Sequence, residues 1–329
     1  MHSTSGGRPE VAIEHCREAA KIASAAGLDE IDAFAESCLA QVYIVAGRLR
    51  DAVEAGERAV SSFEARDNLW WAARTLWHLN SAASCLGEWE ASLSYSKRGL
   101  EHGIALNDLR LRSHGWSRTG LTHISRGNPE QGIQCCNEAL ALVPIPRDAV
   151  WAKAVRSYGM IKAGQVDDGI AELKEALAWY ESSHMRWTYV IGAGWLAEGY
   201  LRRGDPASAR PLIDDVLETS RTTGYLHYEG RACWLMAECL AIKAPATAED
   251  YAATAIRIFE RVDARNDLAK ALVTRARLRR GAGDVATARR LLDQALVISR
   301  ALGTLDEPAR VAAAIDALDL GSPIPLLAG

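Results

Sequence analysis

The sequence predicts an all-α solenoid, in which about seven helical hairpins stack one after another along the chain. Two observations support this prediction. A short turn recurs at a nearly constant interval, and small or branched side chains keep the same spacing from each turn. Both observations are typical of repeat proteins, in which each unit packs mainly on its neighbours.

The recurring turn is a glycine followed by a polar residue. It occurs as Gly47-Arg48, Gly87-Glu88, Gly127-Asn128, Gly164-Gln165, Gly204-Asp205 and Gly283-Asp284. The last interval between these glycines is a double step, and Lys243-Ala244-Pro245 lies in its middle. Proline there replaces glycine as the helix breaker. The turns therefore divide the chain into units of about 40 residues.

Three positions keep phase with these turns. Five residues after each turn anchor stands a small residue: Ala52, Ser92, Gly132, Gly169, Ala209, Ala248 or Ala288. Twelve residues after it stand Ala59, Gly99, Ala139, Ala176, Val216, Ala255 and Ala295, and each is followed by Val, Leu or Ile. Small side chains allow two helices to approach closely, and the aliphatic column fills the seam between units.

Each unit is therefore interpreted as helix A, a tight turn, helix B and a loop. We expect A helices near 29–46, 68–86, 108–126, 148–163, 185–203, 225–242 and 266–281. We expect B helices near 49–65, 88–105, 129–143, 166–182, 206–222, 246–263 and 285–301. Asn128 and Asp205 each precede a proline and suit helix N-caps, and Gly224 and Gly303 suit C-terminal stops.

The whole chain, 1–329, is interpreted as one solenoid with seven repeats over about 28–302. Residues 307–319 carry Val311, Ile315 and Leu318 at helical spacing, which predicts a capping helix that begins near Pro308. Residues 8–27 are in phase with a B helix that lacks its A helix, because Gly7-Arg8 lies 40 residues before Gly47-Arg48.

An unpartnered B helix would leave Ile13, Cys16, Ala20 and Ile22 partly uncovered. Either the natural protein continues upstream of this edge, or the edge allows self-association with a second chain. Both possibilities follow from the expected position of the first turn.

The segment 195–209, WLAEGYLRRGDPASA, resembles the tetratricopeptide repeat, with Leu196, Tyr200, Gly204 and Ala209 at the positions of that family's pattern. The resemblance covers nearly the whole chain and departs in its longer period. It implies a right-handed superhelix of helical hairpins with the A helices on the concave side. The ending, 264–311, resembles the repeat arrays at the C-terminal ends of bacterial ATPase and cyclase signalling regulators.

Composition excludes several classes of function. The formal net charge is −4, which is unfavourable for binding nucleic acid or an anionic membrane surface. No phosphate-binding loop, metal-binding motif or nucleophile elbow occurs, so we expect no cofactor, no metal and no catalytic residues. Seven cysteines within apolar helical patterns indicate reduced thiols and a cytoplasmic location.

The repeat phase predicts which side chains face the concave groove. These candidate partner-binding residues are Arg74, Trp77, Ser81, His114, Ser117, Trp151, Tyr158, Lys162, Glu198 and Arg202. Apolar anchors among fixed charges suit a peptide groove. Trp77 and Trp151 are equally compatible with the core. Trp70, Trp71, Trp187 and Tyr225 lie at loop-to-helix junctions and are interpreted as packing between repeats.

Two functions are consistent with this pattern. The first is a non-catalytic scaffold or regulatory module that binds a protein or peptide along the groove. The second is a sensor that binds a small inducer for an attached effector, as the resemblance to signalling regulators implies. An open apolar groove would favour the first function, and a deep pocket with convergent polar groups would favour the second.

Overall fold

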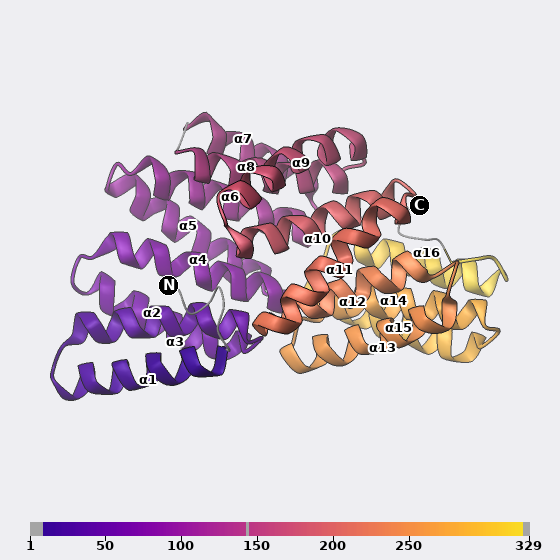
Figure 1. The fold of residues 1–329 in the computed structure, drawn as a ribbon, viewed down its shortest axis with the longest axis horizontal. Coiled ribbons are helices and arrows are strands. Elements are labelled where there is room, and N and C mark those ends of the chain that lie inside the picture. Colours follow the sequence, from indigo (N-terminus) through magenta and orange to yellow (C-terminus); the bar gives the residue numbers. More distant parts are fainter. Residues whose placement is uncertain (1–8, 143–144, 325–329) are drawn as a thin grey trace.

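The protein is described by a computed structural model over residues 9–142 and 145–324, and sixteen α-helices occur in these residues. Their bounds are α1 Pro9–Ala25, α2 Asp29–Val45, α3 Leu49–Glu64, α4 Leu69–Leu86, α5 Trp89–Ala105, α6 Leu109–Arg126, α7 Pro129–Ala141 and α8 Pro146–Lys162. The series continues with α9 Val166–Ser182, α10 Arg186–Arg202, α11 Pro206–Thr223, α12 Leu226–Leu240, α13 Pro245–Val262, α14 Arg265–Gly281, α15 Val285–Leu302 and α16 Glu307–Asp319. Figure 1 shows them as antiparallel hairpins wound into a superhelix.

The predicted A and B helices correspond to α2 through α15 to within a few residues. The small residues five and twelve positions after each turn are all buried, which confirms their role. A Cβ atom added at Gly132 would lie 2.4 Å from Ile124 Cγ1, and one added at Gly169 would lie 2.7 Å from the Ser157 carbonyl oxygen. These columns are therefore where the two helices of a hairpin touch.

The predicted helix ends are also confirmed. The Asn128 side chain accepts a hydrogen bond from Gln131 N, and the Asp205 side chain accepts one from Ser208 N. Gly224 and Gly303 end α11 and α15 in the left-handed conformation. Because these caps satisfy backbone groups that helices leave unpaired, they fix where each unit turns.

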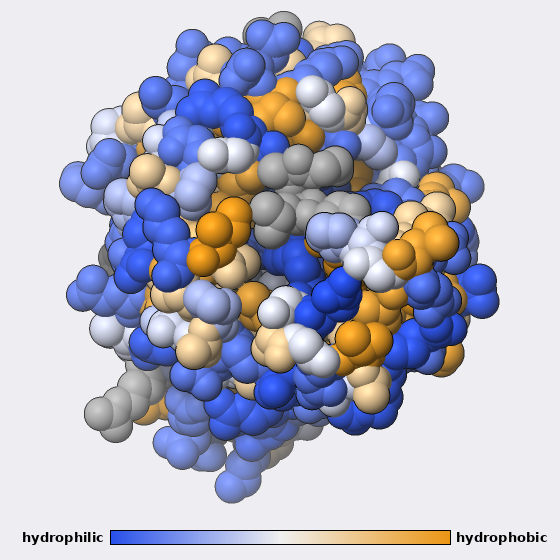
Figure 2. Space-filling model, turned by 90° about the vertical axis from the view of Figure 1, so that its right-hand side faces the viewer, coloured by the Kyte–Doolittle hydropathy of each residue, from blue (hydrophilic) through white to orange (hydrophobic). Residues whose placement is uncertain are grey.

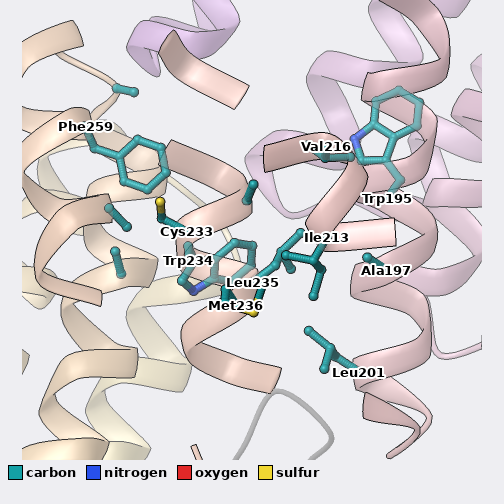
Figure 3. Close-up of a cluster of buried hydrophobic side chains, with 14 of the residues drawn as sticks. Trp195, Ala197, Leu201, Ile213, Val216, Cys233, Trp234, Leu235, Met236 and Phe259 are labelled. Carbon is teal, nitrogen blue, oxygen red and sulfur yellow. The ribbon is translucent and has the colours of Figure 1, made fainter. Parts of the chain in front are cut away.

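The largest part of the core runs from α6 to the C-terminal helices. Figure 3 shows the region where α10 to α13 meet, with Trp195, Ile213, Met236 and Phe259 among the buried side chains. Separate, smaller apolar clusters lie among the earlier helices, one around Leu39, Val42 and Leu86 and another around Phe63, Leu76 and Leu79.

The superhelix closes on itself, because the first three hairpins pack against the last ones. Leu305 N donates to the Arg126 carbonyl oxygen at 2.7 Å, and Asn266 Nδ2 donates to the Ser125 carbonyl oxygen at 3.3 Å. Arg50 Nε donates to Asp263 Oδ2 at 2.9 Å. Helix α14 also packs directly against α4. Figure 1 shows these early and late hairpins side by side.

The two ends of the described chain differ in how they are covered. Ile13 on α1 is buried against α2, so the expectation that it is uncovered was wrong, because α1 packs on α2 as every other B helix packs on the next A helix. Ile22 is 59% exposed, as expected for that edge. Gly7-Arg8 lies outside the described residues. Helix α16 buries Val311, Ile315 and Leu318.

One face of the molecule is mostly polar. Figure 2 shows the face formed by the right-hand side of Figure 1, where hydrophobic residues form small groups among hydrophilic ones. Within residues 9–142 and 145–324, no helix has the length and hydropathy required to cross a membrane.

Candidate functional site

The inner helices line a cavity of about 330 Å³ that is partly open to solvent, which we call the interior pocket. Its walls come from α2, α4, α6, α8, α10, α12 and α14, together with Tyr180 of α9, so both turns of the superhelix contribute. A larger cavity of about 830 Å³ lies where α12, α13 and α14 meet Gly321 to Ile324. None of the ten residues predicted to face the groove lines that cavity, so the interior pocket is the better candidate.

Six of the ten residues predicted to face the groove line the interior pocket: Arg74, Trp77, Ser81, His114, Trp151 and Tyr158. Their side chains come from α4, α6 and α8. Trp77 and Trp151 are each only 6% exposed, and that remaining exposure lies in the pocket wall. These two rings therefore belong to the core and to the pocket at once.

The other four predicted residues are placed elsewhere. Ser117 is buried, and its hydroxyl donates to the His114 carbonyl oxygen. Lys162 and Arg202 lie 3.6 and 3.1 Å from Glu198 Oε1 in a buried ion cluster that borders a separate, smaller cavity. Although burial alone would raise the pKa of Glu198, Lys162 and Arg202 hold that pKa far below its usual range. These charges are structural partners of one another.

Flat aromatic faces form much of the pocket wall. Trp77 stacks on His114 with ring centroids 3.8 Å apart, and Tyr158 stacks on Trp195 at 4.9 Å. Burial lowers the pKa of His114, which keeps its ring neutral beside Trp77 near pH 7. Trp187 contacts Tyr225 and Tyr228 across the α10–α12 junction. As predicted, Trp187 packs between repeats, and it also lines the pocket.

One half of the pocket, on α12 and α14, has balanced charges. Asp267 accepts a hydrogen bond from His227 at 2.8 Å and lies 3.5 Å from Lys270 Nζ and 3.8 Å from Arg231 Nη1. Arg231 also lies 3.4 Å from Glu198. Each cation in this half therefore has a carboxylate within ion-pair distance, and each carboxylate lies close to several cations.

The other half, which we call the cationic half, comprises Arg74, Arg110, Arg118 and Arg147 with a single carboxylate, Asp148. Asp148 is 2% exposed and is already occupied: Arg110 Nε lies 3.1 Å from it, Arg147 Nε 3.6 Å and His114 Nε2 2.9 Å. Among the described residues, neither Arg74 nor Arg118 has an ion-pair partner.

The surroundings of these two guanidinium groups lower their pKa values. Burial lowers the pKa of Arg118 to about 10. Burial, and then repulsion from Arg147 and Arg118, lowers the pKa of Arg74. Arg118 Nη1 donates to Ser81 Oγ at 2.6 Å, and its guanidinium carbon lies 4.9 Å from the Trp151 ring centroid. Both groups remain charged near pH 7, so the cationic half has excess positive charge.

Several hydrogen-bond donors of the pocket have no acceptor within the described protein. They include Nε of Arg74 and Arg118, Nε1 of Trp77 and Trp151, and the Tyr180 hydroxyl. A buried donor without an acceptor is costly, so folded proteins rarely retain several of them in one place without a function. All five of these residues line the interior pocket.

Cys85, His227 and Asp267 link the two turns of the superhelix across the pocket. Cys85 Sγ on α4 lies 3.8 Å from His227 Nδ1, and His227 Nε2 contacts Asp267. Although burial alone would lower it, contact with Cys85 and the hydrogen bond to Asp267 raise the pKa of His227 to about 10. No group of three His, Cys, Asp or Glu residues that could hold a metal ion occurs within the described residues.

Sequence phase did not single out several residues of the pocket. Three of them stand nine residues before a turn glycine: His78, Arg118 and Trp195. Trp77 was selected because it stands ten residues before its turn glycine, so these three occupy the next position along the helix. A helical wheel that included this position would have found them. His227, Arg231 and Asp267 reach the pocket only because the superhelix closes, and no local pattern reports that closure.

Neither a described protein family nor a curated protein matches the chain. Among solved structures, it is similar to a Rap protein complexed with competence and sporulation factor, at 13% identity and a TM-score of 0.66 over 84% of this chain and 76% of that one.

Two further structures are similar. The apo form of RapI has 10% identity and a TM-score of 0.57, over 82% of this chain and 98% of that one. Aspartyl phosphate phosphatase F from Bacillus subtilis has 12% identity and a TM-score of 0.56, over 88% and 75%. At these identities the likeness concerns the fold alone, which is a tetratricopeptide-like α-solenoid as the sequence predicted.

Proposed function

We propose that this chain is a non-catalytic regulatory module that binds a compact ligand in its interior pocket. The observation that carries the proposal is the convergence of unsatisfied donors and stacked aromatic rings on one cavity. Ligand sites combine an apolar, aromatic lining with a few well-placed polar groups, and a volume of about 330 Å³ is at the lower end of their range.

Contact between the early and late hairpins favours a compact ligand over a protein partner lying along an open groove. The last hairpins close the concave side where such a groove would run, through contacts such as that of Leu305 with Arg126. The pocket admits a small molecule or a few residues of a peptide. Of the two functions that the sequence left open, binding of a small inducer is therefore the better supported.

A regulatory role follows because helices of both turns of the superhelix form the walls of the interior pocket. An occupant would contact α4 and α6 of the first turn and α12 and α14 of the second. Binding would therefore stabilise the closed superhelix relative to any opened form, since a ligand shifts an equilibrium by its differential affinity for the two states. The similar Rap protein complexed with competence and sporulation factor is in keeping with regulation by binding in such a fold.

A pocket-filling substitution tests the proposal. Ser84 lines the pocket, and Ser84→Trp would occupy much of it, whereas Ser94→Trp adds the same side chain at an exposed position of α5. We expect the neutral fluorophore N-phenyl-1-naphthylamine to bind the natural chain and the Ser94→Trp variant, and binding to Ser84→Trp to fall at least about tenfold. Equal binding to all three folded proteins would contradict the proposed site.

A further inference from the structure

We infer that the ligand of the interior pocket carries a compact anionic oxygen group, a carboxylate or a phosphate, which Arg74 and Arg118 hold while its flat apolar body stacks on the aromatic wall. The inference rests on the proposed function and adds the chemical class of the ligand. It is carried by the unequal distribution of charge within one cavity.

The imbalance is confined to the cationic half. Around Asp267 and Glu198, every cation has a carboxylate within 3.8 Å. In the cationic half, by contrast, four arginines face one carboxylate, Asp148, which already lies within 3.6 Å of Arg110, Arg147 and His114. A buried charge without a counter-charge is unfavourable, and an anionic ligand is the group that would neutralise it.

The unsatisfied atoms indicate the same chemistry. Four of these atoms are donors that cannot accept a hydrogen bond: Nε of Arg74, Nε of Arg118 and the indole Nε1 atoms of Trp77 and Trp151. Their common complement is an acceptor with several lone pairs. Carboxylate and phosphate oxygens meet that requirement, and charge-assisted hydrogen bonds from guanidinium groups are the strongest of this type.

The contacts that Arg74 and Arg118 already make do not provide a hydrogen-bond acceptor for their Nε–H groups. Arg118 uses Nη1 on Ser81 and lies over the Trp151 ring, and Arg74 lies over the rings of Trp70 and Trp77. Aromatic faces attract a cation but accept no hydrogen bond in the plane of the guanidinium. The Nε–H groups of both arginines therefore remain available to a ligand.

The aromatic wall defines the rest of the ligand. The Trp77–His114 and Tyr158–Trp195 stacks present flat surfaces on α4, α6, α8 and α10. A planar or otherwise apolar body of the size of two fused rings fits the cavity of about 330 Å³ beside them. The ligand class is thus a small aromatic or apolar carboxylic acid, or a phosphate ester of an alcohol or phenol with a body of that kind.

Three probes that share one body test the inference by calorimetric titration: 2-naphthoate, 2-naphthyl phosphate and the neutral 2-naphthamide. We expect the better anion to bind at least about tenfold more tightly than the amide, since one charge-assisted hydrogen bond has about that effect. Preference for naphthoate would identify a carboxylate ligand, and preference for naphthyl phosphate a phosphate ester.

The variants Arg74→Gln and Arg118→Gln should each reduce anion affinity about tenfold and leave amide affinity unchanged. Arg300→Gln removes the same charge from an exposed position of α15 and should change neither affinity. Because Arg74 and Arg118 lie largely buried inside the superhelix, anion affinity should depend less on salt than binding to surface arginines does. Far-ultraviolet circular dichroism confirms that each variant is folded.

The outcomes separate the inference from the proposed function. If all three probes bind equally and Ser84→Trp abolishes their binding, the pocket binds ligands but the anionic assignment is wrong. If anions bind and neither Ser84→Trp nor Arg118→Gln weakens them, the site lies elsewhere and both proposals fall. Failure of every probe to bind at millimolar concentration would overturn the inferred ligand class, and the N-phenyl-1-naphthylamine titration would then decide the proposed function alone.

Discussion

The guanidinium carbon of Arg118 lies 4.9 Å from the ring centroid of Trp151, and no carboxylate among the described residues pairs with it. Arg231, in the same pocket, lies 3.4 Å from Glu198 and 3.8 Å from Asp267. Two arginines that line one cavity therefore differ in whether a counter-charge is present.

This difference predicts opposite effects on stability. Replacing Arg118 with Met removes an uncompensated charge, so the free energy of unfolding should rise by about 1 kcal/mol in the absence of ligand. Replacing Arg231 with Met leaves Glu198 and Asp267 less well paired and should lower it by about 3–5 kcal/mol. Urea unfolding followed by circular dichroism measures both. A loss of equal size in Arg118→Met would mean that Arg118 has a stabilising partner.

His227 predicts a dependence of stability on pH. Its pKa is about 10 in the folded protein, against about 6.5 in an unfolded chain. The folded state therefore binds the proton more tightly, and the contribution of His227 is complete below pH 6.5 and is lost as pH rises toward 10. The difference in unfolding free energy between the natural chain and His227→Gln should shrink steadily between pH 6.5 and 9.5.

Lys162 titrates in an overlapping range with the opposite sign. Burial and the neighbouring Arg202 lower the pKa of Lys162 to about 8, so its unfavourable charge is relieved in the folded state above that pH. Because Lys162 is present in both proteins, its effect cancels in the difference between them. A difference that stayed constant or grew with pH would rule out a raised pKa for His227.

Two turn glycines with the same backbone conformation have different surroundings. Gly204 has φ +79° with no atom within 4 Å of an added Cβ, so Gly204→Ala should cost about 1–2 kcal/mol from the left-handed conformation alone. Gly127 has φ +96°, and a Cβ there would lie 2.8 Å from Asp306 N. Gly127→Ala should therefore cost at least about 1 kcal/mol more. Thermal unfolding compares them, and equal losses would mean that the turns of the superhelix do not touch at Asp306.

The sequence predicted the repeat, because the forces that define a hairpin are local. A cap such as Asp205 and a small residue such as Gly169 act within one unit, and their spacing recurs in every unit. Closure of the superhelix could not be predicted in this way. It depends on small rotations between units that accumulate over five hairpins, and the contact of Arg126 with Leu305 leaves no periodic mark on the sequence.

The same limit applies to the candidate site. Phase alone placed Arg74, Trp77 and Trp151 on the inner surface, and they do line the pocket. It also selected Lys162 and Arg202, which are engaged by Glu198, because sequence phase reports the face of a helix but not which charges find partners across the interior. The distinction between paired and unpaired arginines therefore required the structure.

The contacts between turns also predict how damage spreads. An ideal solenoid transmits a local defect only to adjoining repeats. Here Val262 at the end of α13 lies against the first turn, since a Cβ added at Gly47 would lie 2.5 Å from Val262 Cγ1. Phe259 is fully buried one helical turn earlier, and Phe259→Ala should cost about 3–5 kcal/mol. Amide hydrogen exchange should then accelerate in α12 to α14 and also in residues 43–50, far away in sequence.

Leu173→Ala provides the matched control. Leu173 is fully buried on α9, in a hairpin whose turn glycine, Gly164, has no atom within 4 Å of an added Cβ. Its loss should cost about 2–5 kcal/mol and raise exchange only in α8 to α10. The two variants remove comparable apolar contacts and differ in whether the damaged helix touches the other turn. If Phe259→Ala left exchange in residues 43–50 unchanged, the closed superhelix would not be a cooperative unit, and a ligand could not act by stabilising it.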